Sequence, residues 1–183
     1  MTEFFFIFIQ FFIIFFLLSF NICNCLPSNF KLNKFSLPEN ITFNTIIFLN
    51  FILIISFFNV RLNTIIISYF LYVILLLIIY LYKFKTLSVA IEKNLYLFLL
   101  LFFTSLIIFF EVSNNLVVGW DAQQFWIYKT LNFYNDNSLT NLSNLPNAWY
   151  PYLGSLSWSF FWKISFIDHE YYGRFFYVFI YLS

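Results

Sequence analysis

The sequence predicts an all-α integral membrane protein, and its composition and long apolar runs are the observations that predict it. Of the 183 residues, 62% are hydrophobic and 9% are charged, whereas soluble domains are about 45–50% apolar and about 25% charged. A water-soluble fold of this size could not bury so much apolar surface, so lipid must be the solvent for most of it. The runs do not alternate as barrel strands do, which leaves helices as the spanning elements.

Four apolar runs are long enough to cross a bilayer, whose hydrocarbon core of about 30 Å needs roughly 20 helical residues and about 17 at the lower limit. The first could instead be a secretory signal, but it carries Glu3 and no preceding Lys or Arg, and no convincing cleavage site follows. We expect Pro27 and Pro38 to interrupt any helix in the loop after it. Residues 1–110 are therefore predicted to hold membrane helices over 4–20, 41–60, 62–82 and 94–110.

The basic residues predict an orientation in the cytoplasmic membrane. Loops on one side hold Arg61 and Lys129, and loops on the other hold five lysines, Lys31, Lys34, Lys83, Lys85 and Lys93. Cytoplasmic loops carry the excess of positive residues, so the five-lysine side is expected to be cytoplasmic and residues 111–150 to lie on the outer face. This assignment assumes four spans, and the loss of one would invert it.

The chain changes character after residue 110. Residues 111–152 are polar and rich in Asn, which predicts an outer-face loop. Residues 153–183 become apolar again and predict one or two further membrane or re-entrant helices. The last run begins at Phe175 and stops after nine residues, too few to cross a bilayer. We therefore expect the sequence to be the N-terminal part of a longer protein.

The segment 119–129 at the start of this loop holds the best candidate site. Asp121 is a carboxylate between two tryptophans where a membrane helix meets water. A helix beginning there is amphipathic, with an aromatic side that faces lipid and Lys129 able to snorkel beside it. Asp-Ala-Gln-Gln also has the form of a capping box, so the residues alone leave helix capping and catalysis or metal binding open for Asp121. The polar strip of this helix would continue through Gln124, Tyr128, Asn132 and Asn135.

Three motifs in order resemble the GT-C membrane glycosyltransferases, most closely the branch with the protein mannosyltransferases and the aminoarabinose transferase. They are Trp-Asp-Ala-x-x-Phe-Trp at 120–126, Tyr-Pro-Tyr-Leu-Gly at 150–154 opening an apolar stretch, and Gly173-Arg174 before a fresh helix. The similarity covers about residues 117–180. The chain departs from the family at Ala122, where a second acid is common, and in having four predicted helices before the acidic loop rather than one.

The resemblance implies transfer of a sugar from a polyprenyl-phosphate carrier to an acceptor outside the membrane. Asp121 would accept the proton of the attacking hydroxyl, because a carboxylate with an ordinary pKa of about 4 is ionised at neutral pH. Gln124 and Tyr128 would contact the substrate, and the leaving phosphate would need a cation. Lys129, Lys163 and Arg174 are the later cations, and interfacial anchoring is the alternative for each.

The sequence leaves the cofactor unassigned and allows an alternative function. Ala122 puts a paired-carboxylate metal site in doubt, so the cofactor is unknown, with a divalent metal left open and no metal ligand assigned. His169, between Asp168 and Glu170, is either a solvated loop residue or a metal ligand.

The expected partners are the lipid bilayer and a polyprenyl-phosphate sugar, and no basic patch for nucleic acid is present. The alternative function is a non-catalytic multi-pass protein or a transporter fragment, although no charge falls within the four predicted spans.

Overall fold

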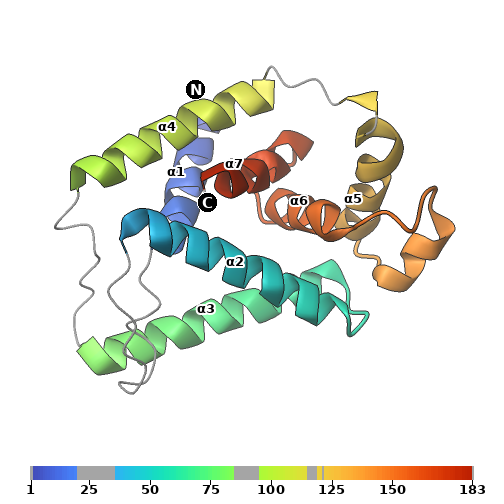
Figure 1. Ribbon diagram of the computed structural model, residues 1–183, viewed down its shortest axis with the longest axis horizontal. Helices are drawn as coiled ribbons and strands as arrows, with labels where there is room; N and C mark the ends of the chain where they lie inside the picture. The colour runs from blue at the N-terminus through green and yellow to red at the C-terminus, as the bar shows by residue number, and fades with distance from the viewer. Residues whose placement is uncertain (1, 20–35, 85–94, 115–118, 121, 183) are drawn as a thin grey trace.

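The computed structural model describes residues 2–19, 36–84, 95–114, 119–120 and 122–182, and every regular element within them is helical (Figure 1). The all-helical class predicted from the sequence is therefore confirmed for this part of the chain. The long helices are α1 (Thr2–Leu18), α2 (Leu37–Ser56), α3 (Leu62–Phe84) and α4 (Leu95–Asn114). The shorter elements are a π-helical turn η3 (Ala122–Trp126), α5 (Ile127–Tyr134), a 3-10 helix η4 (Leu139–Asn144), α6 (Leu153–Lys163), a second 3-10 helix η5 (Glu170–Arg174) and α7 (Phe175–Leu182).

Three of the described helices are long and apolar enough to span a membrane, over Leu37–Ser56, Leu62–Tyr82 and Leu95–Val112. These correspond to the second, third and fourth predicted spans. The first predicted span is present as α1, whose apolar part, Phe5–Leu18, is shorter. The whole of α1, Thr2–Leu18, has 17 residues, which is the lower limit of about 17 for a crossing. The multi-pass class thus holds, while the count of four spans remains a prediction.

The start of α2 corrects one expectation about the loop before it. Pro38 was expected to interrupt any helix, but it lies in the first turn of α2, which begins at Leu37. A proline is tolerated there because the first backbone N–H groups of a helix have no intrahelical partner. Ser36 and Glu39 close the turn as a capping box, with the Ser36 N–H donating to the Glu39 carboxylate over 2.7 Å.

Lipid must cover most of α3. Only 11% of its spanning stretch is buried inside the protein, so burial within this chain cannot account for its apolar sequence. The exposed side chains recur at helical spacing along one stripe, as expected for a surface that faces hydrocarbon. They include Ile67, Phe70, Leu71, Ile74, Leu75, Ile78 and Leu81.

The turn between α2 and α3 contacts the polar loop that follows α5. Asn59 and Asp136 both adopt positive φ angles, of 55° and 65°, a conformation that Asn and Asp tolerate better than most residues. The Asn59 carboxamide oxygen accepts from the Thr140 N–H over 3.1 Å, and the Asp136 carboxylate accepts from the Asn63 N–H over 2.9 Å. The two polar loops therefore lie at the same end of the molecule.

An aromatic core joins α7 to the long helices. The rings of Phe109 in α4 and Phe175 in α7 stack with centroids 4.1 Å apart, and Phe11 of α1 lies 5.3 Å from Phe175. Figure 1 shows α6 and α7 between α4 on one side and α2 and α3 on the other. Helix α6 has 11 residues, fewer than the roughly 17 that a crossing requires. Both inner helices pack against longer ones, α6 against α2 and α3, and α7 against α2 and α4.

Serines let α5 and α6 pack closely and in parallel. The Ser155 hydroxyl donates to the Trp126 carbonyl over 3.1 Å, and the Ser159 hydroxyl donates to the Thr130 carbonyl over 2.6 Å. Both pairs are 29 residues apart in sequence, which shows that the helices run in the same direction. Small residues allow backbones to approach, and their hydroxyls add hydrogen bonds across the interface.

Candidate functional site

Asp121, the predicted catalytic carboxylate, lies outside the described residues, so neither its role as a base nor its role as a cap is tested. Among the described neighbours, the Gln123 N–H donates to the Gly119 carbonyl over 3.0 Å. The next five residues form a π-helical turn rather than the α-helix expected from Asp121. A π turn holds more residues than an α turn. The polar residues of 122–126 are therefore not spaced as the predicted α-helical strip requires.

Two predicted substrate-binding residues remain accessible. Gln124 is exposed on the π-helical turn, and Tyr128 is 46% exposed on the first turn of α5. Asn135 is also exposed, whereas Asn132 is half-buried. The accessible part of the predicted strip therefore centres on Gln124 and Tyr128, both within one or two turns of residue 121.

An aromatic row connects this surface to the loop before α6. It consists of Trp120, Phe125, Tyr150 and Trp149, in the order in which their rings touch. Phe125 is the centre, with its ring edge-on to Trp120 at 5.7 Å and stacked on Tyr150 at 5.3 Å. Trp149 follows at 6.2 Å from Tyr150. The outer members are the most open, with Trp120 68% and Trp149 81% exposed, so aromatic faces are presented at both ends.

Lys129 does not snorkel, which corrects the sequence-based expectation. The side chain is fully buried, and its Nζ donates to the Tyr150 carbonyl over 2.7 Å. The ammonium also lies over the Trp126 and Tyr150 rings, 5.7 and 5.8 Å from their centroids. Burial lowers the pKa of Lys129 because it penalises the charged form. This lysine ties the Tyr150 segment to α5 and offers no open ammonium to a substrate.

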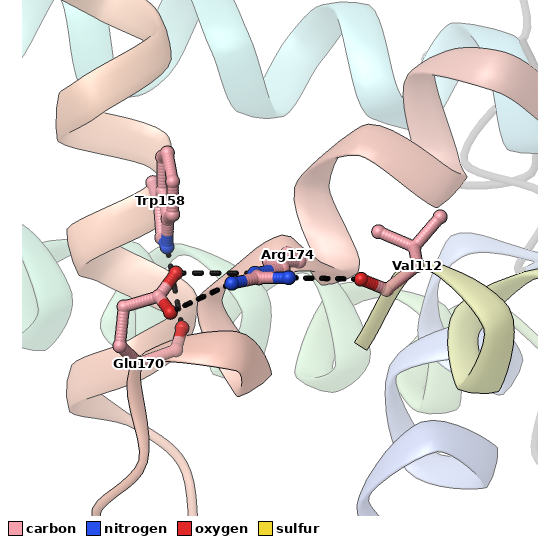
Figure 2. Close-up of polar contacts among 4 residues, drawn as sticks. All are labelled: Val112, Trp158, Glu170 and Arg174. Carbon is pink, nitrogen blue, oxygen red and sulfur yellow. Dashed lines mark hydrogen bonds and ion pairs between the residues drawn. The ribbon is translucent and has the colours of Figure 1, made fainter. Parts of the chain in front are cut away.

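Arg174 is likewise committed to internal contacts (Figure 2). Its Nε and Nη2 donate to the two Glu170 carboxylate oxygens over 3.2 and 3.0 Å, and its Nη1 donates to the Val112 carbonyl over 2.9 Å. The Trp158 indole N–H donates to the Glu170 carbonyl over 3.2 Å. Arg174 therefore holds η5 and α6 against the C-terminal end of α4. A cation is also stabilised there by the negative end of the helix dipole. The contact of Arg174 with substrate phosphate stays a prediction.

Asp168 forms a third polar cluster that fastens the loop after α6 to α5. Its Oδ1 accepts from the Tyr134 hydroxyl and from the Trp162 indole N–H, the latter over 2.9 Å. The Tyr134 and Trp162 rings stack with centroids 4.0 Å apart. The hydrogen bonds from Tyr134 and Trp162 lower the pKa of Asp168. Burial, with a further contribution from the bond to Asp168, raises the pKa of Tyr134 to about 12.

Lys163 belongs to the same cluster and completes a pattern among the later cations. Its Nζ donates to the Tyr134 carbonyl over 3.0 Å and lies 4.4 Å from the centre of the Tyr134 ring. Lys129, Lys163 and Arg174 thus each donate to a main-chain carbonyl. Cations placed in this way satisfy carbonyls that a helix end or a loop leaves unpaired. The three cations thus make internal contacts, and interfacial anchoring, the alternative from the sequence, stays a prediction for each.

Metal ligands are not gathered in the described part of the chain, where no group of three His, Cys, Asp or Glu side chains is close enough to hold an ion. His169 is exposed, and its ring stacks on Tyr171 with centroids 5.2 Å apart. Its two acidic neighbours face other partners, Asp168 toward Tyr134 and Glu170 toward Arg174. The three adjacent residues therefore do not converge on one point.

Two structural features escaped the sequence analysis although a signal for each was present. Glu170 and Arg174 have the i, i+4 spacing of a helical ion pair. Ser155 and Ser159 have the small-x-x-x-small spacing of closely packed membrane helices. The Asp168 cluster had no such signal, because Tyr134 and Asp168 are 34 residues apart.

Comparison with known proteins finds no similar protein. No family model, no curated protein and no solved structure matches the chain.

Proposed function

We propose that this multi-pass membrane protein contributes to glycosyl transfer from a polyprenyl-phosphate sugar on the outer side of the cytoplasmic membrane, with Asp121 as the general base. One observation carries the proposal. Residue 121 is flanked by accessible groups of the kind that bind sugars, namely the indole of Trp120, the amide of Gln124 and the phenol of Tyr128. Aromatic faces pack against the C–H faces of sugar rings, and amide and phenol groups hydrogen-bond to hydroxyls.

The proposed chemical step is a single displacement at the anomeric carbon. The acceptor hydroxyl oxygen forms a bond to that carbon as the bond to the polyprenyl-phosphate oxygen breaks. The hydroxyl proton passes to the Asp121 carboxylate, and the electron pair leaves with the phosphate. A carboxylate of ordinary pKa, about 4, is ionised at neutral pH and able to accept this proton.

The internal contacts of the three later cations favour a second function. In it the protein is a non-catalytic multi-pass protein whose polar loop anchors it at the membrane surface. A leaving phosphate requires positive charge or preorganised donors, but Lys129, Lys163 and Arg174 donate to internal carbonyls. The aromatic row would then act as an interfacial belt, since Trp and Tyr are enriched where a membrane meets water.

Substitution of Asp121 by Asn separates the two functions. Membranes from cells that express the complete reading frame are supplied with labelled polyprenyl-phosphate hexoses, and transfer to acceptor is measured. Asn is about as good an N-cap as Asp, so the amount of protein in the membrane should not change. Loss of the general base should lower transfer by about 10²–10⁴-fold. Wild-type rates in D121N would exclude Asp121 from the chemistry, whereas transfer no faster than in membranes without the protein would leave the anchoring function.

Asp136→Asn is the matched control. It makes the same chemical change in the same polar loop, where the carboxylate accepts from the Asn63 N–H. An Asn oxygen can accept that hydrogen bond, and Asn tolerates the positive φ angle of 65° at this position. We expect D136N to transfer sugar within about twofold of the wild-type rate, since surface substitutions away from a site change little.

A further inference from the structure

A cavity among the membrane helices lies apart from the proposed sugar site. Its main part has a volume of about 260 Å³ and is lined by side chains of α1, α2, α3 and α6 and of the segment just after α6. A smaller hollow of about 50 Å³ adjoins it, and Leu17, Leu18 and Tyr69 line both. On α3 the lining of the two parts extends from Tyr69 to Leu77, a rise of about 12 Å along a helix. The cavity is therefore elongated along a helix that is long enough to cross a membrane.

The main part of the cavity offers little to a polar ligand. Its described polar side chains are Gln10 and Tyr69. The Gln10 Oε1 accepts from the Phe166 N–H over 3.2 Å and the Nε2 is buried, so this amide has no donor that a ligand can reach. The Tyr69 hydroxyl is then the side-chain donor that remains. A buried water usually needs two to four polar partners, so water is a poor occupant of this part.

The smaller hollow is narrow, and its polar side chains have partners within the protein. The Asn44 Nδ2 donates to the Leu18 carbonyl over 2.6 Å, and the Tyr72 ring stacks on Phe51 with centroids 5.2 Å apart. Aliphatic side chains of α1, α2 and α3 form most of the remaining wall. A thin hydrocarbon suits this part of the cavity.

The main part opens on the outside of the helices. Ile13, Phe70 and Phe166 line it and are 45%, 42% and 60% exposed. Protein interiors contain few unfilled spaces of this size, because the walls of an empty space lose their dispersion contacts. The acyl chains of the bilayer are the hydrocarbon that surrounds these helices, so they are the molecules best placed to enter and fill the cavity.

We propose that this cavity holds one unbranched acyl chain of a bilayer lipid. The chain enters beside Ile13 and Phe70, packs against the apolar walls of the main part, and extends past Tyr69 into the smaller hollow. A rigid ring would fill the main part alone, and the methyl branches of a polyprenyl chain are too wide for the smaller hollow. The proposal does not depend on chemistry at residue 121.

The test compares two lipids with the same head group and the same backbone length, dipalmitoyl-phosphatidylcholine and diphytanoyl-phosphatidylcholine. The second carries methyl branches along its chains. The protein is purified in detergent, each lipid is added in turn, and native mass spectrometry counts the lipids retained per protein. We expect saturable retention of one dipalmitoyl lipid. Retention of the diphytanoyl lipid should be about tenfold weaker, because additional methyl groups overpack a narrow space.

Three variants locate the bound chain. Leu17→Trp places an indole where the two parts of the cavity meet and should abolish retention of the dipalmitoyl lipid. Ile78→Trp adds the same ring on α3 at a side chain that is 57% exposed and lines neither part, so retention should persist. Tyr69→Phe keeps the ring and removes the hydroxyl, and should retain the lipid within about twofold, because a hydrocarbon chain accepts no hydrogen bond.

The comparison of the two lipids uses the wild-type protein, so it decides the matter even if Leu17→Trp does not fold. Absence of saturable retention of the dipalmitoyl lipid, or equal or tighter retention of the branched lipid, would overturn the proposal. So would unchanged retention in a folded Leu17→Trp. Loss of retention in Tyr69→Phe would show that the occupant is held by a polar group and would overturn a hydrocarbon chain.

Discussion

At the scale of single residues, the contact between Gly173 and Trp158 shows how closely η5 and α6 are packed. A Cβ atom at residue 173 would overlap the Trp158 indole and lie 2.5 Å from the Trp158 carbonyl oxygen. Trp158 is itself held by the hydrogen bond from its indole to Glu170. The Trp158 side chain therefore cannot move aside without breaking its hydrogen bond to Glu170, the residue that pairs with Arg174.

We accordingly predict that Gly173→Ala destabilises the protein by about 1–3 kcal/mol, the usual cost of overpacking a close contact. Denaturant-induced unfolding in detergent measures the change. Gly154→Ala is the control, because a Cβ there would meet nothing within 4 Å. That change should be neutral or stabilise by about 0.4–1 kcal/mol through the unfolded chain. Equal effects of the two substitutions would contradict the packing at Gly173.

The Asp168 cluster predicts a pH dependence whose sign follows from the lowered pKa of Asp168. A carboxylate whose pKa is lower in the folded than in the unfolded protein stabilises the fold above its ordinary pKa of 3.8. That stabilisation is lost as the pH falls through the folded value. Tyr134→Phe removes the hydrogen bond that lowers this pKa most. We therefore expect the free energy of unfolding to fall less between pH 7 and pH 2 in Tyr134→Phe than in the wild type.

The alkaline side and a control complete this prediction. Because the pKa of Tyr134 is raised to about 12, the contribution of its neutral hydroxyl persists to about pH 10 and is lost as the pH rises through 12. Tyr128→Phe changes an exposed tyrosine on the same helix and should keep the wild-type acid profile. An identical acid profile in Tyr134→Phe and the wild type would exclude Asp168 as the titrating group.

At the scale of elements, the interface between α5 and α6 depends on the small size of its serines. Ser159 is fully buried, and its hydroxyl donates to both Thr130 and Ser155 carbonyls. Ser155 repeats the arrangement one turn earlier with Trp126. Since α6 also packs against α2 and α3 through Phe160, separation of α5 from α6 would detach the polar loop from the membrane helices.

We predict that Ser159→Leu destabilises the protein by about 1–3 kcal/mol because the extra atoms would push α5 and α6 apart. Ser159→Ala should cost about 1 kcal/mol, since only hydrogen bonds are lost. Thermal unfolding of the purified protein in detergent checks both values. Ser143→Leu, on the exposed side of η4, should change stability by no more than about 0.5 kcal/mol. A milder effect of Leu than of Ala at Ser159 would contradict close packing.

The sequence predicted the helices where composition dominates and missed details where tertiary contacts decide. The long apolar runs placed α3 and α4 within a few residues, because a bilayer demands a minimum length. The start of α2 was missed because Pro38 was interpreted as a breaker rather than as a first-turn residue. Lys129 was expected to reach water, but the Tyr150 carbonyl comes from a segment 21 residues away, and no local pattern shows such a partner.

For the whole molecule, the contacts between polar loops bear on its orientation in the membrane. The α2–α3 turn is hydrogen-bonded to residues 136 and 140, so these loops must lie on the same side of the bilayer. The end of α4 is tied to η5 instead, through the Val112 carbonyl, which accepts from Arg174. The orientation of this end of the molecule decides which compartment the loop after α5 faces.

Accessibility of this end to a membrane-impermeant thiol reagent in intact cells tests the account most directly. Cys23 and Cys25 are first replaced by Ala, and single cysteines are then introduced at Ser143 on the exposed side of η4 or at Tyr96, which is 90% exposed near the start of α4. With residues 111–150 on the outer face, Ser143→Cys should be labelled in intact cells and Tyr96→Cys only after the membrane is opened. Labelling of Tyr96→Cys in intact cells, with Ser143→Cys protected until lysis, would contradict the account.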